Sequence, residues 1–99
     1  MEIKQIQTGD TIVLKIAGKL TAVAEEAFCG VIDDALTKTN RLVLDFQDVS
    51  YVASAGLRVL VSTRKKITAL QGSFVLRNLK DDILEVFRIT GLDTILTIE

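Results

Sequence analysis

The 99-residue sequence contains no histidine, no proline and no tryptophan, and it has a single cysteine, Cys29. Without histidine, neither a Ser/His catalytic triad nor the usual zinc-binding sets can form. One cysteine cannot form an internal disulfide bond. The sequence also has no secretory signal and no long apolar span, so we expect a cytoplasmic protein without membrane insertion.

Motifs that carry enzyme chemistry are missing as well. The sequence has neither a Gly-x-Gly-x-x-Gly loop nor a Walker lysine. The stretch around Ser54 lacks the first glycine of a Gly-x-Ser-x-Gly elbow, and no general base stands beside the serine. We therefore expect no enzyme, no cofactor and no metal site. The formal charge of −1 and the pI near 5.4 give no bulk attraction to nucleic acid.

Apolar residues make up 48% of the chain, which is enough to fill the core of one domain spanning residues 1–99. Alternating and continuous apolar runs predict strands, and apolar residues spaced three and four apart predict helices. The alternation of strand and helix patterns along the chain predicts α/β packing. The expected strands are 2–6, 11–16, 42–46, 74–79 and 94–98, and the expected helices are 22–37, one starting at Ser54, and one running from Asp81 to Gly91.

A small serine-bearing turn follows the apolar strand 42–46. Here Ser54 stands among Ala53, Ala55 and Gly56, just before a helical pattern. The first backbone N–H groups of a helix lack partners, so Ser54 either caps them with its hydroxyl or carries a phosphate that they and the helix dipole favour. Its small neighbours would let another protein approach the hydroxyl closely. Asp45 and Asp48, three residues apart beside this turn, are expected to be solvated turn residues, with a shared cation as the less favoured alternative.

The run from Asp45 to Leu57, DFQDVSYVASAGL, resembles the signature of the STAS domain family. Gly18-Lys19-Leu20 and the segment 87–93 resemble further blocks of that family, so the likeness covers nearly the whole chain. The resemblance implies a STAS-like α/β fold, with a mixed sheet of four to five strands and helices mainly on one face.

The resemblance also implies a function. Free-standing bacterial members are anti-sigma-factor antagonists, whose serine at the position of Ser54 is phosphorylated by an anti-sigma factor that is itself a serine kinase. The unphosphorylated antagonist binds that kinase and frees the sigma factor for transcription. The phosphorylated one does not, and a phosphatase is expected to reset the switch.

Two residues depart from the family pattern. Many phosphorylated members have an aspartate before the serine and another after the first block, where this chain has Ala53 and Thr21. The departures leave an alternative open, in which the chain is a constitutive subunit of a lipid-transport or stress-sensing assembly and Ser54 only caps its helix. Phosphorylation of Ser54 is the reading that the motif favours.

If the switch operates, the partner-binding surface includes the start of the helix and the turn around Thr21, which would also cap the helix 22–37. The residues expected there are Thr21, Ala53, Ser54, Ala55, Gly56, Leu57 and Arg58. A basic cluster, Arg64-Lys65-Lys66, lies later on the same helix. It is interpreted as a solvated face near the helix C-terminus, with an acidic partner as the alternative.

Overall fold

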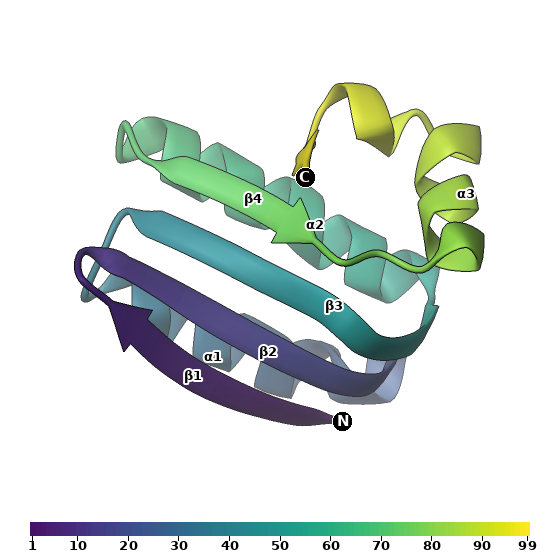
Figure 1. The fold of residues 1–99 in the computed structure, drawn as a ribbon, viewed down its shortest axis with the longest axis horizontal. Helices are drawn as coiled ribbons and strands as arrows, with labels where there is room; N and C mark the ends of the chain where they lie inside the picture. Colours follow the sequence, from purple (N-terminus) through teal and green to yellow (C-terminus); the bar gives the residue numbers. More distant parts are fainter.

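A computed structural model describes residues 1–99, in which strands and helices alternate along the chain (Figure 1). The elements are β1 (Glu2–Thr8), β2 (Thr11–Leu20), the 3-10 turn η1 (Ala22–Ala24), α1 (Glu25–Leu36), β3 (Arg41–Val52), α2 (Ser54–Ala69), β4 (Ser73–Arg77), α3 (Asp81–Ile89), η2 (Leu92–Thr94) and β5 (Thr97–Ile98).

The five strands form one mixed sheet in the order β1-β2-β3-β4-β5. The hairpin β1–β2 is antiparallel, while each later pair is parallel and is joined by a helical crossover. The predicted mixed sheet, with five strands, is therefore confirmed. The predicted last strand, 94–98, is wrong at its start, because η2 occupies residues 92–94 and β5 is two residues long.

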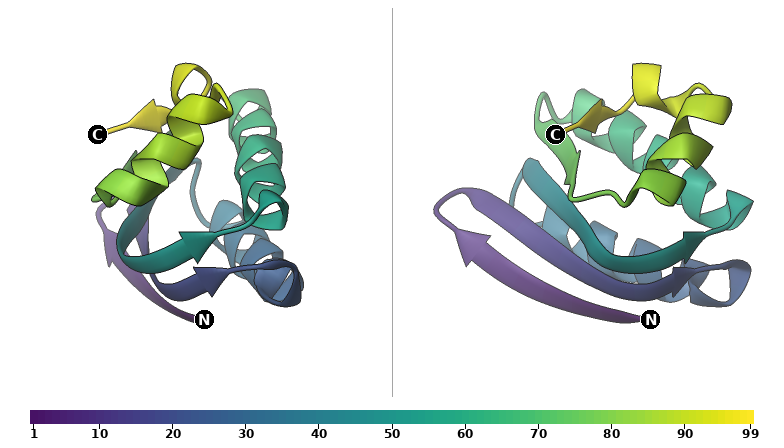
Figure 2. Two further views of the ribbon diagram at one scale, coloured as in Figure 1. Left: turned by 90° about the vertical axis from the view of Figure 1, so that its right-hand side faces the viewer. Right: turned by 45° about the vertical axis from the view of Figure 1, so that its right-hand side comes forward.

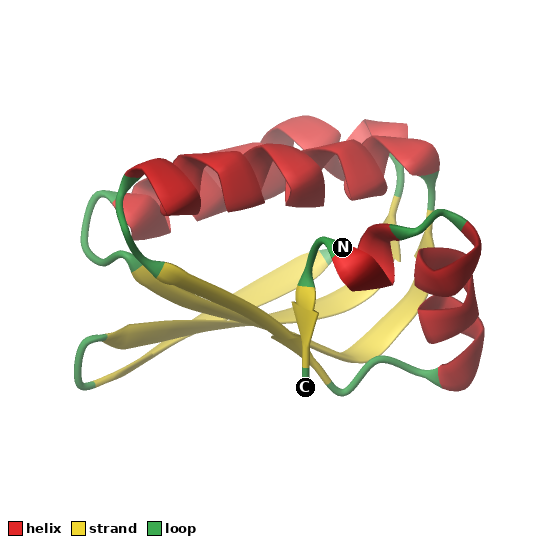
Figure 3. Ribbon diagram, turned by 90° about the horizontal axis from the view of Figure 1, so that it is seen from above, coloured by secondary structure: helices red, strands yellow, loops and turns green.

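Helices α1 and α2 lie side by side on one face of the sheet, as predicted (Figure 3). The strand residues that face them are fully buried, among them Ile12 and Leu14 of β2 and Leu42 and Leu44 of β3. Helix α3 lies at the end of the sheet toward which β4 points (Figure 1). The rings of Phe46 and Phe87 join α3 to β3 edge to face, with centroids 6.4 Å apart.

Strand β3 is longer than predicted. The expected strand 42–46 was followed by a polar turn, but β3 continues to Val52 and bends as it does so (Figure 2). Its second half pairs with β2 across two register irregularities and buries Val49. Gln47 and Asp48 are exposed on the outer side of this bent segment, and their polar side chains led to the prediction of a turn.

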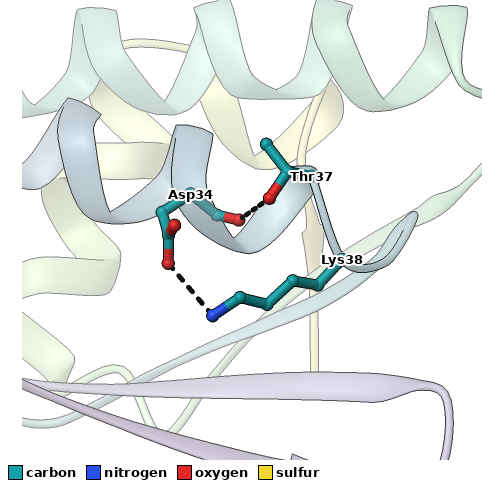
Figure 4. Close-up of polar contacts among 3 residues, drawn as sticks. All are labelled: Asp34, Thr37 and Lys38. Carbon is teal, nitrogen blue, oxygen red and sulfur yellow. Dashed lines mark hydrogen bonds and ion pairs between the residues drawn. The ribbon is translucent and has the colours of Figure 1, made fainter.

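Helix α1 begins three residues later than predicted, after η1, and ends near a short polar cluster (Figure 4). There the Thr37 hydroxyl donates to the carbonyl oxygen of Asp34 at 2.6 Å, and Lys38 pairs with the Asp34 carboxylate at 3.2 Å. Both side chains of the ion pair are about half exposed, so it adds little to stability. These contacts satisfy the helix end rather than build a site.

Asp45 is not a solvated turn residue. It lies within β3, is only 5% exposed, and accepts hydrogen bonds from the Asn78 amide and the Gln47 N–H, both at 3.0 Å. Burial raises the pKa of its carboxyl, but these two bonds and the positive charges of Arg77 and Lys15 outweigh burial and hold the pKa below its ordinary value of 3.8. The carboxylate therefore fastens the segment after β4 to the sheet.

We expect Asp45→Asn to destabilise the fold more at neutral pH than in acid. A group with a lowered folded-state pKa contributes stability above its unfolded pKa, and loses that contribution as pH falls through the folded value. Urea unfolding of both proteins at about pH 7 and about pH 3 measures the difference. Asp48→Asn is the matched control, since the Asp48 side chain is exposed and makes no hydrogen bond or ion pair. If Asp45→Asn lowered the free energy of unfolding equally at both pH values, the lowered pKa of the Asp45 carboxyl would be contradicted.

Gly72 fixes the tight connection between α2 and β4. A Cβ atom at this position would lie 1.9 Å from the carbonyl oxygen of Asn40, which itself accepts the Ser73 N–H at 2.9 Å. Because the obstacle is backbone rather than a flexible side chain, a larger residue must displace the start of β3 or of β4.

Gly72→Ala should therefore lower the free energy of unfolding by roughly 3 kcal/mol, at the upper end of the cost of overpacking. Chemical denaturation measures it. Gly30→Ala should do the opposite: Gly30 is exposed inside α1 with open space around it, and alanine favours helix by about 1 kcal/mol over glycine. Equal destabilisation by both changes would refute the steric argument.

Candidate functional site

The site lies where β2 and β3 end side by side. These strands are parallel, so their carboxyl ends meet at one edge of the sheet, where Leu20 pairs with Val52. The N–H of Ala53 donates to the carbonyl oxygen of Leu20 at 2.8 Å and joins the two exits. The turn at Thr21 and the turn at Ser54 therefore lie next to each other, as the predicted surface requires.

Ser54 is not an N-cap, which corrects the capping interpretation. The N-cap residue of α2 is Ala53, with extended backbone angles (φ −91°, ψ 170°), and no side chain caps this helix. Ser54 is the first helical residue, it is exposed, and its hydroxyl makes no hydrogen bond within the protein. The hydroxyl is thus free to react or to contact a partner.

Ala55 and Gly56 do not contribute an exposed surface, although both were predicted partner contacts. Ala55 is 3% exposed, and Gly56 is buried. A Cβ atom at Gly56 would lie 3.0 Å from the Leu20 Cβ and 3.2 Å from the Val52 Cγ1. These small residues let α2 start directly against the ends of both strands. Their role is to position Ser54, while the half-buried Leu57 and the exposed Arg58 face outward.

Thr21 stands at the N-cap position of η1, not of α1, and its side chain makes no capping bond. The predicted helix cap is therefore wrong. Two residues further on, within η1, Val23 is 96% exposed, and η1 contacts α2. The sequence analysis did not single out Val23, although its place off the apolar stripe of the predicted helix was a usable signal.

The start of α2 carries no negative side chain to offset the positive end of its helix dipole. Arg58, one turn on, is in no ion pair. Nowhere in the protein are three or more His, Cys, Asp or Glu side chains close enough to hold a metal ion. None of the helices has both the length and the apolar character needed to cross a membrane.

A groove of about 550 Å³ leads from Ser54 along α2 to the segment that follows α3. Leu57 and Val61 of α2 and Leu92 of η2 form its apolar lining, and Arg58 and Lys65 also line it. The structure divides the predicted basic cluster: Lys65 faces this groove, whereas Lys66 pairs with Asp33 of α1 at 2.8 Å. Only the fold brings Leu92 to α2, so the groove could not be predicted from the sequence.

The architecture and site define a small α/β protein that presents a free serine hydroxyl at the start of a helix, beside the exit of the neighbouring parallel strand. The STAS domain model matches residues 2–99, and the chain belongs to this family.

Named relatives agree with this membership. The chain is 32% identical over 100 residues to the anti-sigma-B factor antagonist of Listeria monocytogenes, an alignment that covers all of this chain and 87% of that protein. A shorter match to BtrV of Bordetella bronchiseptica, 45% identical over 51 residues, covers 52% of this chain and 44% of that protein. The chain thus resembles anti-sigma-factor antagonists, which are regulators.

A solved structure shows the same fold. The Bacillus cell fate determinant SpoIIAA in its phosphorylated form matches with a TM-score of 0.76 at 21% identity, over 99% of this chain and 91% of that one. At this identity the likeness concerns the fold alone. The predicted STAS-like fold is therefore confirmed.

Because Ser54 is exposed and makes no capping bond, Ser54→Ala should change the free energy of unfolding by less than about 0.5 kcal/mol, rather than the roughly 1 kcal/mol typical of a lost cap. Thermal and chemical denaturation measure this change. Thr63→Val is a useful comparison, because it removes a serine-like hydroxyl from the same helix that is buried and hydrogen-bonded: the Thr63 hydroxyl donates to the Val59 carbonyl oxygen at 2.7 Å. A loss of 1 kcal/mol or more in Ser54→Ala would restore the capping role.

Proposed function

We propose that this protein is an anti-sigma-factor antagonist whose binding is switched by phosphorylation of Ser54. In the unphosphorylated state it binds an anti-sigma factor that is also a serine kinase, and so frees a sigma factor for transcription. The kinase then phosphorylates Ser54 and ends the complex, and a phosphatase restores it. The protein acts in the cytoplasm, as a binding protein rather than an enzyme.

The observation that carries this proposal is the free, exposed hydroxyl of Ser54 at the edge where β2 and β3 end. A serine that served only as a cap would have its hydroxyl bonded to the backbone, and this one does not. The surroundings suit a protein contact, since the fully exposed Val23 and the half-buried Leu57 offer apolar surface on adjoining elements. The alternative, a constitutive subunit, required Ser54 to cap its helix, and Ser54 makes no capping bond.

The charge around Ser54 supports a phosphate there. A phosphate brings about two negative charges and three acceptor oxygens. At Ser54 it would lie at the N-terminus of α2, with no acidic side chain in the first turn. Arg58 is four residues further along the same helix, the spacing at which side chains meet. Ala53 and Thr21, in place of the usual aspartates, leave no carboxylate in these two turns to repel the phosphate.

The switch depends on what the phosphate does to a partner. A surface that packs closely around a neutral hydroxyl would have to desolvate the phosphate and place its own groups against two new charges. The small residues Ala53 and Ala55 leave the Ser54 hydroxyl accessible, so the modification would stand at the contact itself. Binding and phosphorylation are thus mutually exclusive in this proposal.

Ser54→Ala should keep binding to the anti-sigma factor, and Ser54→Asp should weaken it at least about tenfold, because a buried contact that acquires an unpaired charge loses several kcal/mol. The partner is the kinase recovered with the protein from its native cells, identified by mass spectrometry together with the phosphorylation state of Ser54. Calorimetry with the purified pair gives the affinities.

Two controls belong with this experiment. Ser73→Asp places the same charge on an exposed position at the start of β4, away from the ends of β2 and β3 and outside the groove beside α2, and should leave binding largely unchanged. Denaturation of Ser54→Asp should show no loss of stability, since an acidic residue is favourable in a first helical turn. Equal affinities for Ser54→Ala and Ser54→Asp, or a Ser54 that is never modified in any growth condition, would refute the switch.

A further inference from the structure

The groove that begins at Ser54 is long, open and built from two parts of the chain. One wall is the outer side of α2, from Ser54 to Lys65, and the other is formed by Thr90 and Leu92 after α3. Figure 2 shows the segment that follows α3 beside α2. At 1.5 Å per residue, the α2 wall is roughly 17 Å long, which corresponds to three turns of a second helix.

The groove has an apolar floor that the fold does not fill. Leu57 and Val61 stand four residues apart, so they lie one above the other on the same side of α2. Both are half-buried against the core and leave part of their surface in the groove. Leu92 completes the floor from η2 and is 9% exposed. Apolar surface arranged in this way is what an amphipathic helix contacts in a groove.

The charge of the groove has one sign. Arg58 and Lys65 are its charged residues, both are exposed, and neither takes part in an ion pair. They are seven residues apart, two turns of α2, so the two cations bracket the apolar floor. Of the other cations on or near this side, Lys66 is paired with Asp33 and Arg88 with Glu85, while Arg64 is unpaired but lies outside the groove. The two unpaired cations of the groove are therefore available to carboxylates from outside.

We propose that this groove binds an acidic amphipathic helix of the partner protein, with apolar residues on the floor and carboxylates against Arg58 and Lys65. The proposal rests on the function proposed above, because it assigns the helix to the anti-sigma factor that reads Ser54. It extends the binding surface from the Ser54 turn along α2 to η2. A second copy of this chain is a poor occupant, because both of its acidic helices already bury their apolar faces in the core: Phe28 and Ile32 in α1, and Ile83 and Phe87 in α3.

The test is a titration of the isotope-labelled protein with two stapled helical peptides of about 14 residues, followed by NMR. Both peptides carry leucines four residues apart, and they differ in having glutamates or lysines at the flanking positions. The glutamate peptide should bind and shift the signals of Leu57, Val61 and Leu92. The lysine peptide should not bind, because like charges would oppose Arg58 and Lys65.

Charge reversal on α2 supplies the matched variants. Lys65→Glu should weaken binding of the glutamate peptide up to about fivefold, the factor that corresponds to the loss of one exposed ion pair of up to about 1 kcal/mol. Arg64→Glu makes the same change one residue away, outside the groove, and should leave the affinity unaltered. Both positions are exposed, so neither variant disturbs the core.

Several results would overturn the proposal: no binding of the glutamate peptide, equal binding of both peptides, or equal weakening by the two variants. Shifts of the groove signals that depend on protein concentration alone would assign the groove to a second copy instead. None of these results depends on phosphorylation of Ser54. Failure of the groove is therefore distinguishable from failure of the switch, which the kinase experiment measures separately.

Discussion

The parallel pairing of β2 with β3 is the constraint on which the site depends. It aligns Leu20 with Val52 and allows the Ala53 N–H to donate to the Leu20 carbonyl oxygen. The turns that follow the two strands therefore lie side by side. Gly56 makes the arrangement possible, since a side chain there would press against Leu20 and Val52. Helix α2 can therefore begin immediately at the edge of the sheet, and Ser54 stands at its first turn without being buried.

A second consequence concerns the serine itself. Because Ala53 occupies the N-cap position with its extended backbone, the start of α2 is set by chain geometry and not by a side-chain bond. A hydroxyl without a structural task can be modified at little cost to the fold. The same arrangement leaves the first N–H groups of α2 close to Ser54, where they favour a negative charge. In the proposed switch, stability and switching would therefore be carried by different atoms of one short segment.

The strands with clear alternation, such as Ile12, Leu14 and Ile16 in β2, and the helix that Gly91 ends with its left-handed backbone (φ 75°) were predictable from the sequence. The second half of β3 was not, because its exposed polar residues imitate a turn while Val49 is buried through pairing with a distant strand. The capping error at Ser54 was a shift of one residue, which pattern alone cannot resolve. The groove was beyond sequence reasoning altogether, since Leu92 and Val61 are brought together only by packing.

Arg58 connects the two parts of the proposed surface. It lies one turn after Ser54 on α2 and also lines the groove, and no carboxylate of the protein neutralises it. A phosphate on Ser54 would attract this guanidinium strongly, because charged hydrogen bonds to phosphate are among the strongest that side chains make. An acidic partner helix needs the same guanidinium at the groove. Phosphorylation would therefore act twice, by placing charge at the Ser54 contact and by withdrawing a cation from the groove, so that a modification at one end weakens binding along the whole of α2.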